Sequence, residues 1–345
     1  MRKIRSTRSG KTGPGERALV ERIRARASGM SRRGLWLGIG DDCALLRVNP
    51  DEELCVTTDL SLTGRHFRME WHPAEAIGHR VLARGLSDVA AMGGRPVAAF
   101  LSLGLPAELT IAKGRQKAWA DRFFDGLLAL AHLHQTPLAG GDLAESPVAL
   151  ADIVLVGAVP RGKALLRSGA QAGDLLYVTG KLGGAAAGLE LLGRQPESRH
   201  KTIAAGKIPA RLRTVLQPHL FPQPRLAQGQ WLLRRRAATA AIDLSDGLST
   251  DLTHLCEESR LAAEVDAEAL PVHDGATLAQ ALDGGEDYEL LFTASPGVRV
   301  PAAIAGVPVT RIGRMMAARR GEAQVSLRTG AGSQPLKPHG WEHFR

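Results

Sequence analysis

Apolar and polar positions follow two different periods along this chain, and both periods occur in its first and its second half. Short, nearly continuous apolar runs predict buried strands. These runs are 54–58, 97–105, 138–142, 148–159, 175–179, 238–244, 288–293 and 308–313. Apolar residues three or four positions apart predict amphipathic helices. These segments are 16–27, 73–89, 113–134, 185–192 and 248–258. The mixture predicts an α/β (α+β) fold with mixed sheets covered by helices.

The turn Pro160-Arg161-Gly162-Lys163 separates two regions with similar patterns. A chain of 345 residues fits about two domains. We therefore expect one domain at 14–160 and a second at 161–345. Residues 1–13 are polar and basic, and we expect them to form a disordered arm.

The formal net charge of +9 is concentrated at the N-terminus. Residues 1–33 hold 11 Lys and Arg but only two acidic residues, so this segment alone accounts for the excess. Because the remaining chain is neutral, we expect no nucleic-acid partner. We also expect no membrane span, since no run of about 18 apolar residues occurs. Three cysteines without a paired spacing indicate the reducing cytoplasm.

Carboxylates recur beside Gly, Ser or Thr, mostly next to an apolar run. These corners are Gly40-Asp41-Asp42, Thr57-Thr58-Asp59, Ser87-Asp88, Gly140-Gly141-Asp142, Asp243-Leu244-Ser245-Asp246-Gly247 and Gly284-Gly285-Glu286-Asp287. Each alone is compatible with a solvated turn. Together they predict a site for magnesium and phosphate, because magnesium prefers hard oxygen ligands. The candidate ligands are Asp42, Thr57, Thr58, Asp59, Asp88, Asp142, Asp243 and Asp246.

Two local features predict charged partners. Asp88 falls near the C-terminal end of its helix, where the helix dipole disfavours a lone carboxylate, so we expect a cation nearby. The turn Gly180-Lys181-Leu182-Gly183-Gly184 joins a strand to a helix start, which suits either an anion or tight packing.

No nucleophile triad, zinc spacing or protein-kinase signature is present in the sequence. Gly10-Lys11-Thr12 imitates the end of a P-loop, but Arg5 stands where that motif needs glycine. This pattern favours phosphoryl transfer by positioning and charge neutralisation, with neither a covalent nucleophile nor a general base.

The ordered motifs resemble the thiamine-monophosphate kinase family, within the aminoimidazole-ribonucleotide-synthetase-like ATP-binding superfamily. The resemblance spans about residues 15–344. Besides the acidic corners above, its carriers are Gly64-Arg65-His66-Phe67, Leu86-Ser87-Asp88-Val89-Ala90-Ala91-Met92-Gly93, Leu166-Arg167-Ser168-Gly169-Ala170 and Glu286-Asp287-Tyr288-Glu289-Leu290. The chain departs from the family after Gly-Gly-Asp, where Leu143-Ala144-Glu145 replaces the usual Thr-Thr-Arg.

This resemblance implies ATP-dependent phosphorylation of thiamine monophosphate to thiamine diphosphate, with magnesium on the eight candidate ligands. It implies that Gly141, Asp142, Arg167 and Ser245 contact ATP. It places His66, Glu286 and Trp341 on the thiamine side. It further implies a two-domain fold whose first domain forms a homodimer, with the ATP site near the subunit interface.

Two alternatives stay open at this point. One is a superfamily relative that acts on a purine intermediate or on selenide, although no cysteine lies near the N-terminus for selenophosphate chemistry. The other is a non-catalytic nucleotide sensor or nucleic-acid binder that uses the basic arm.

Overall fold

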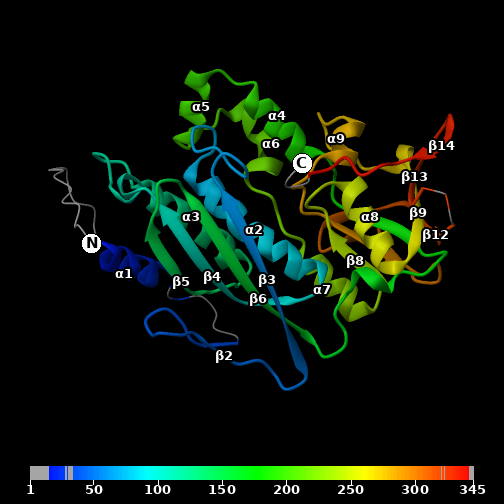
Figure 1. Ribbon diagram of the computed structural model, residues 1–345, viewed down its shortest axis with the longest axis horizontal. Coiled ribbons are helices and arrows are strands. Elements are labelled where there is room, and N and C mark those ends of the chain that lie inside the picture. The colour runs from blue at the N-terminus through cyan, green and yellow to red at the C-terminus, as the bar shows by residue number, and fades with distance from the viewer. Residues whose placement is uncertain (1–14, 28, 30–33, 320, 322, 342–345) are drawn as a thin grey trace, which may run out of the picture.

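The protein is described by a computed structural model that covers residues 15–27, 29, 34–319, 321 and 323–341 (Figure 1). The expected arm at 1–13 lies outside these residues. In the described chain, no helix is both long and apolar enough to cross a membrane.

The first half of the chain builds a four-stranded sheet with the strand order β3-β6-β4-β5. Its strands are β3 (Glu52–Leu62), β4 (Arg95–Leu105), β5 (Leu138–Glu145) and β6 (Leu150–Pro160). β6 pairs antiparallel with β3 and β4, whereas β4 and β5 are parallel. This order leaves β3 and β5 as the two edge strands.

Helices α2 (Ala74–Ala91) and α3 (Trp119–Leu133) cover one face of this sheet, and α1 (Glu16–Ala27) lies beside β5. The predicted apolar faces of α2 and α3 are buried, with Leu82 and Phe123 at zero exposure. The two helices approach closely at Gly78 and Gly126. A Cβ on Gly126 would lie 1.8 Å from the Glu75 carbonyl oxygen, so this crossing requires glycine.

The second half builds a larger sheet in the order β14-β13-β9-β12-β7-β10-β8, with β11 attached to β12. The strands are β7 (Leu175–Thr179), β8 (Ala240–Asp243), β9 (Leu261–Asp266), β10 (Leu290–Ala294), β11 (Ala303–Ile304), β12 (Val307–Ala317), β13 (Val325–Thr329) and β14 (Gly332–Pro335). The helices are α4 (Gly184–Gly193), α5 (Glu197–Ala204), α6 (Ala210–Leu220), α7 (Leu226–Arg235), α8 (Leu248–Ser259) and α9 (Leu278–Asp283). Figure 1 shows the two sheets side by side, and α2 contacts α7, α6 and β8 where they meet.

The prediction of mixed sheets covered by helices is confirmed, but several expected boundaries are wrong. Thr57, Thr58 and Asp59 lie inside β3 rather than at its end, because β3 pairs with β6 along its whole length. Gly141 and Asp142 likewise lie within β5 instead of at a corner. Helix α3 begins at Trp119 rather than at 113. Strands β9 and β13 and helices α7 and α9 were absent from the prediction.

Candidate active site

A cavity of about 380 Å³ lies where the two sheets meet. Predicted site residues from both halves of the chain line it. They are Asp59, His66, Asp88, Asp243, Ser245, Asp246, Glu286 and Trp341. The fold therefore brings together acidic residues from β3 and α2 with Asp243, the last residue of β8, and Asp246, which follows it.

The pair Asp88 and Asp243 forms the buried acidic part of this cavity. The Thr57 hydroxyl donates to Asp88 at 2.5 Å, and the Ser87 hydroxyl donates to Asp243 at 2.7 Å. Burial, together with the charge of Asp243, raises the pKa of Asp88 to about 7. Burial also raises the pKa of Asp243 to about 6. Both carboxylates are thus held in a setting where a cation would favour their charged forms.

The cation expected near Asp88 is present at longer range rather than in contact. Arg167, in the short helix Arg167–Gly169, lowers the pKa of both Asp88 and Asp243 through its charge. The direct partner of Asp88 is instead the Thr57 hydroxyl.

Asp59 has a basic partner that sequence reasoning missed. The Arg84 Nη2 atom of α2 lies 3.1 Å from Asp59 Oδ1. Burial raises the pKa of Asp59, and Arg84 opposes that effect. A signal was available, because Arg84 lies four residues before Asp88 on the same helix and so faces the same side.

The other side of the cavity holds His66, Glu286 and Trp341. The backbone N–H of Leu62 donates to His66 Nδ1 at 3.1 Å, which leaves the proton of the neutral ring on Nε2. Trp341 is 49% exposed, and its backbone N–H donates to the Asp246 carbonyl at 3.0 Å. Burial favours the neutral acid of Glu286, but Arg80 outweighs it and lowers the pKa of that carboxyl.

The remaining predicted residues lie elsewhere in the single chain. Asp42, Gly141 and Asp142 line a second cavity, of about 600 Å³, between α1 and the edge strand β5. Asp142 is three strand positions from Asp59, which corresponds to about 14 Å across the sheet. A single chain therefore brings Asp59, Asp88, Asp243 and Asp246 into one cavity, whereas Asp42 and Asp142 line another.

Thr58 is separated from Thr57 and Asp59 by strand alternation. Neighbouring residues of a strand point to opposite faces, so Thr57 and Asp59 face α2 while Thr58 faces away. The Thr58 hydroxyl instead donates to Asp152 on β6 at 3.2 Å. Thr58 thus lies on the sheet face that α2 and α3 leave uncovered.

The cavity side chains fit magnesium by their chemistry, although they do not stand ready as ligands. Among the described residues, no group of three His, Cys, Asp or Glu side chains has a metal-binding arrangement. The reason is visible in the contacts, since Arg84, Thr57 and Ser87 engage the carboxylates of Asp59, Asp88 and Asp243. The four aspartates of this cavity supply the hard oxygen donors that magnesium prefers. They are Asp59, Asp88, Asp243 and Asp246.

The glycine-rich turn before α4 has its anion within the protein. The N–H groups of Gly183 and Ala185 donate to the Asp287 carboxylate at 2.6 and 3.0 Å. Packing is also tight, because a Cβ on Gly183 would lie 2.8 Å from the Ala281 nitrogen. The expectation of tight packing is confirmed, and the helix start is occupied by the Asp287 carboxyl, whose pKa burial raises to about 7.

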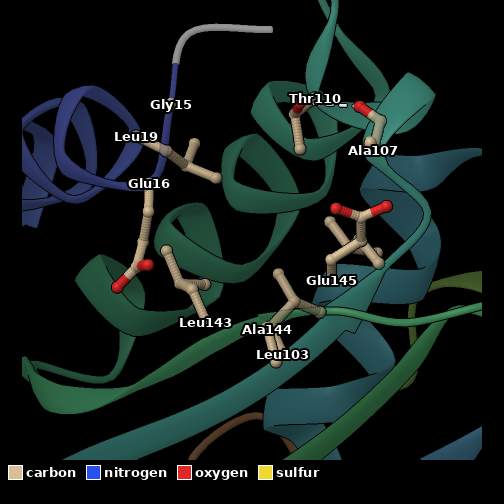
Figure 2. A pocket seen from close by; sticks show the side chains of 10 residues that line it. Gly15, Glu16, Leu19, Leu103, Ala107, Thr110, Leu143, Ala144 and Glu145 are labelled. Carbon is tan, nitrogen blue, oxygen red and sulfur yellow. Dashed lines mark hydrogen bonds between the residues drawn. The ribbon is translucent and has the colours of Figure 1, made fainter. Parts of the chain in front are cut away.

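A third hollow, of about 300 Å³, lies beside the start of α1. Figure 2 shows the side chains that line it. Apolar side chains of α1, β4 and β5, including Leu19, Leu103 and Leu143, form much of its wall. None of the predicted site residues lines it. We therefore assign it no part in the site.

Comparison with known proteins places both halves of the chain. Residues 40–161 match the family AIR synthase related protein, N-terminal domain, and residues 171–326 match AIR synthase related protein, C-terminal domain. The thiamine-monophosphate kinase of Salmonella typhimurium is 40% identical over 315 residues, covering 88% of this chain and 91% of that protein.

Two solved structures agree with this result. The thiamine-monophosphate kinase of Stenotrophomonas maltophilia superposes with a TM-score of 0.74 at 38% identity, covering 90% of this chain and 95% of that one. A complex described as AaThiL with AMPPCP and TMP superposes with a TM-score of 0.73 at 28% identity, covering 98% and 99% of the two chains.

Proposed function

We infer that this chain, which belongs to the thiamine-monophosphate kinase family, phosphorylates thiamine monophosphate with ATP and so forms thiamine diphosphate. The observation that carries this function is the cavity between the sheets. The buried Asp243 and the half-buried Asp59, Asp88 and Asp246 line one side of it, and Glu286, His66 and Trp341 line the other. A site for a polyphosphate beside a site for an aromatic cation is what this reaction requires.

The acceptor determines what the protein must supply. A phosphate monoester has a second pKa of about 6, so it is mostly a dianion at neutral pH and needs no general base. The obstacle is the repulsion between this dianion and the triphosphate of ATP. Catalysis therefore depends on positioning and on neutralising charge.

Asp59, Asp88, Asp243 and Asp246, with the Thr57 hydroxyl, are the residues that would hold magnesium. Bound there, magnesium would neutralise phosphate oxygens as a Lewis acid. The carboxylates are bonded to Arg84, Thr57 and Ser87 in the free chain, so these partners keep them in place before a metal binds. Arg167 and Ser245 lie at the ATP side in this proposal.

The acceptor side suits the thiamine rings. Arg80 keeps Glu286 ionised, so this carboxylate can attract the positive charge of the thiamine. His66 can donate from Nε2, since Nδ1 already accepts from the Leu62 N–H. The half-exposed indole of Trp341 offers a flat face for stacking on a cationic ring.

A homodimer through the first sheet completes the proposal. Leu54, Val56 and Leu60 lie on the uncovered face of β3 and are 49%, 62% and 47% exposed. Apolar side chains in a row on one strand face favour a partner surface. We assign the dimer contacts, with the Thr57, Asp59 and Asp88 share of the ATP and magnesium site, to the domain at 14–160. The domain at 161–345 completes the site. In the dimer, Asp42, Thr58, Gly141 and Asp142 of one chain would serve an ATP site near the interface.

The expected compartment is the cytoplasm. Cys43, Cys55 and Cys256 are free thiols in the described chain, which is usual for proteins of reducing compartments.

The direct test mixes the protein with ATP, magnesium and thiamine monophosphate, and then separates the thiamine phosphates. We expect thiamine diphosphate to form in proportion to enzyme. No product at saturating magnesium would contradict the proposed function. The change in melting temperature on adding thiamine monophosphate would then be compared with the change on adding aminoimidazole precursors. A larger change with the precursors would identify a superfamily relative that acts on a different substrate.

A further inference from the structure

Arg80 occupies a buried position behind the acceptor side of the cavity, where it contacts three separate segments. Its side chain is 5% exposed. Nη2 donates to the Glu286 carboxylate at 2.5 Å and to the His66 carbonyl at 3.2 Å. Nη1 donates to the His219 carbonyl on α6. One guanidinium thus joins the segment of His66, the loop of Glu286 and helix α6.

The hydrogen bonds beyond Arg80 pass through two buried histidines. A guanidinium only donates, so His219 Nδ1, 3.2 Å from Arg80 Nη1, is an acceptor. The proton of His219 then lies on Nε2 and is donated to His72 Nε2 at 2.9 Å. His72 Nδ1 lies 2.9 Å from the Arg68 carbonyl and 3.1 Å from the Arg68 backbone N–H, so with its proton on Nδ1 it donates to that carbonyl. This chain of bonds ends in the segment that carries His66.

Burial disfavours the charged form of both histidines. Burial and the charge of Arg80 lower the pKa of His72 to about 4, and the same causes hold the pKa of His219 well below its usual value. A protonated ring would place two donors face to face between His72 and His219.

The backbone at Glu286 also needs an external hold. Glu286 has φ of +70° and Tyr288 has φ of +52°, both in the left-handed region that non-glycine residues seldom adopt. The Glu286 N–H donates to the Ser245 carbonyl at 2.8 Å. Such a conformation persists where surrounding contacts determine it, and the ion pair with Arg80 is the side-chain contact that does so.

We propose that Arg80 is a positioning residue for the acceptor, because its guanidinium sets the distance between Glu286 and the His66 segment across the two halves of the chain. This proposal rests on the proposed function and deepens it. Arg80 lies behind Glu286 and acts on the thiamine through Glu286 and His66. Arginine is required because its planar fork reaches a carboxylate and two carbonyls together, whereas a lysine ammonium is a single flexible point.

The experiment compares steady-state kinetics of wild type, Arg80→Met and Arg80→Lys. For Arg80→Met we expect the KM for thiamine monophosphate to rise at least about tenfold, since a buried, charged hydrogen bond is lost. The KM for ATP should stay within about twofold. The KM of Arg80→Lys for thiamine monophosphate should lie between the values of wild type and Arg80→Met, because the ammonium still reaches Glu286 but not all three segments.

A matched control is present in the same chain. Arg225 forms a buried pair with Glu289, with side chains 19% and 5% exposed, and neither residue lines the cavity between the sheets. Arg225→Met should lower the melting temperature while leaving the KM for thiamine monophosphate within about twofold of wild type. A structural role for Arg80 would instead make both variants behave alike.

The outcomes separate the two proposals. A wild-type enzyme that forms no thiamine diphosphate contradicts the proposed function. If the wild type is active and Arg80→Met has an unchanged KM for thiamine monophosphate, only the positioning role is overturned. The same holds if the KM values for thiamine monophosphate and for ATP rise in parallel. If Arg80→Met yields no folded protein, Arg80→Lys decides. A rise in acceptor KM of about threefold or more supports the role, and no change overturns it.

Discussion

The cavity between the two sheets and the pocket at the edge strand β5 carry the same local motif, a carboxylate beside small residues, yet they differ in burial. In the cavity, Asp243 is 3% exposed and bonded to Ser87, and Asp88 is bonded to Thr57. At the edge, Asp42 and Asp142 are exposed. A motif therefore marks chemistry, but the surrounding fold decides whether its side chain is arranged before a ligand arrives.

The ionisation of the cavity carboxylates follows from this difference in burial. Buried carboxylates that face one another resist ionisation, which is why the pKa of Asp88 is raised to about 7. The exposed carboxylates of the edge pocket keep their hydration. In the cavity, carboxylates that repel each other are held close together, and a bound cation would relieve this repulsion. The edge pocket does not hold its carboxylates in a buried pair.

The largest expected effect tests the cavity. Asp88→Asn or Asp243→Asn should lower kcat by about 10²–10³ or more, since a charge at the phosphate site is lost. Stability without magnesium should be unchanged or higher, because the amide removes a buried charge. Asp274→Asn is the control. Asp274 is exposed, forms a surface ion pair with Lys181 and does not line the cavity. Wild-type turnover in either cavity variant would remove that residue from the metal set.

The next effect tests whether the edge pocket serves a partner's site. Asp59→Asn and Asp142→Asn should each reduce turnover by orders of magnitude and leave the fold intact. If Asp142 acts across the dimer, an equal mixture of the two variants should recover about a quarter of wild-type activity, since half the dimers are mixed and each has one intact site. No recovery after subunit exchange would place Asp142 outside the partner's site.

A smaller effect tests the surface that joins the two regions in the proposed dimer. Val56→Arg places a charge on the uncovered face of β3 and should shift the protein toward monomer in sedimentation velocity. Turnover should fall with the dimer fraction. Leu133→Arg is the matched control, because Leu133 is similarly exposed, at 66%, but lies at the end of α3. Equal behaviour of the two variants would argue against this interface.

The smallest effect concerns metal binding alone. Magnesium without nucleotide should raise the melting temperature of the wild type by a few degrees, because a ligand of the folded state stabilises it by mass action. Asp88→Asn should lose most of this shift, and Asp142→Asn should keep it. A full shift in Asp88→Asn would place the metal away from the cavity.

Much of the fold could be predicted because strands and helices have different burial periods. The strand at 175–179 and the helix at 16–27 agree with β7 and α1. The strands β9 and β13 were missed, since β9 contains Ala262, Ala263 and Glu264 and its apolar signal is weak. The ends of β3 and β5 were also misplaced, because pairing with neighbouring strands extends them past the small residues that suggested corners.

The sequence by itself determined two periodic patterns, one for strands and one for helices. It also determined the chemical groups available, namely carboxylates beside small residues and an aromatic residue near the C-terminus. Only the tertiary structure decided their grouping, because strand alternation turns Thr58 away from Asp59 and the order β3-β6-β4-β5 moves Asp142 to the far edge. It also decided the basic partners, since Arg80 and Arg84 meet Glu286 and Asp59 only where α2 packs between the sheets. Local periodicity records burial, but contacts between distant segments depend on how the layers are stacked.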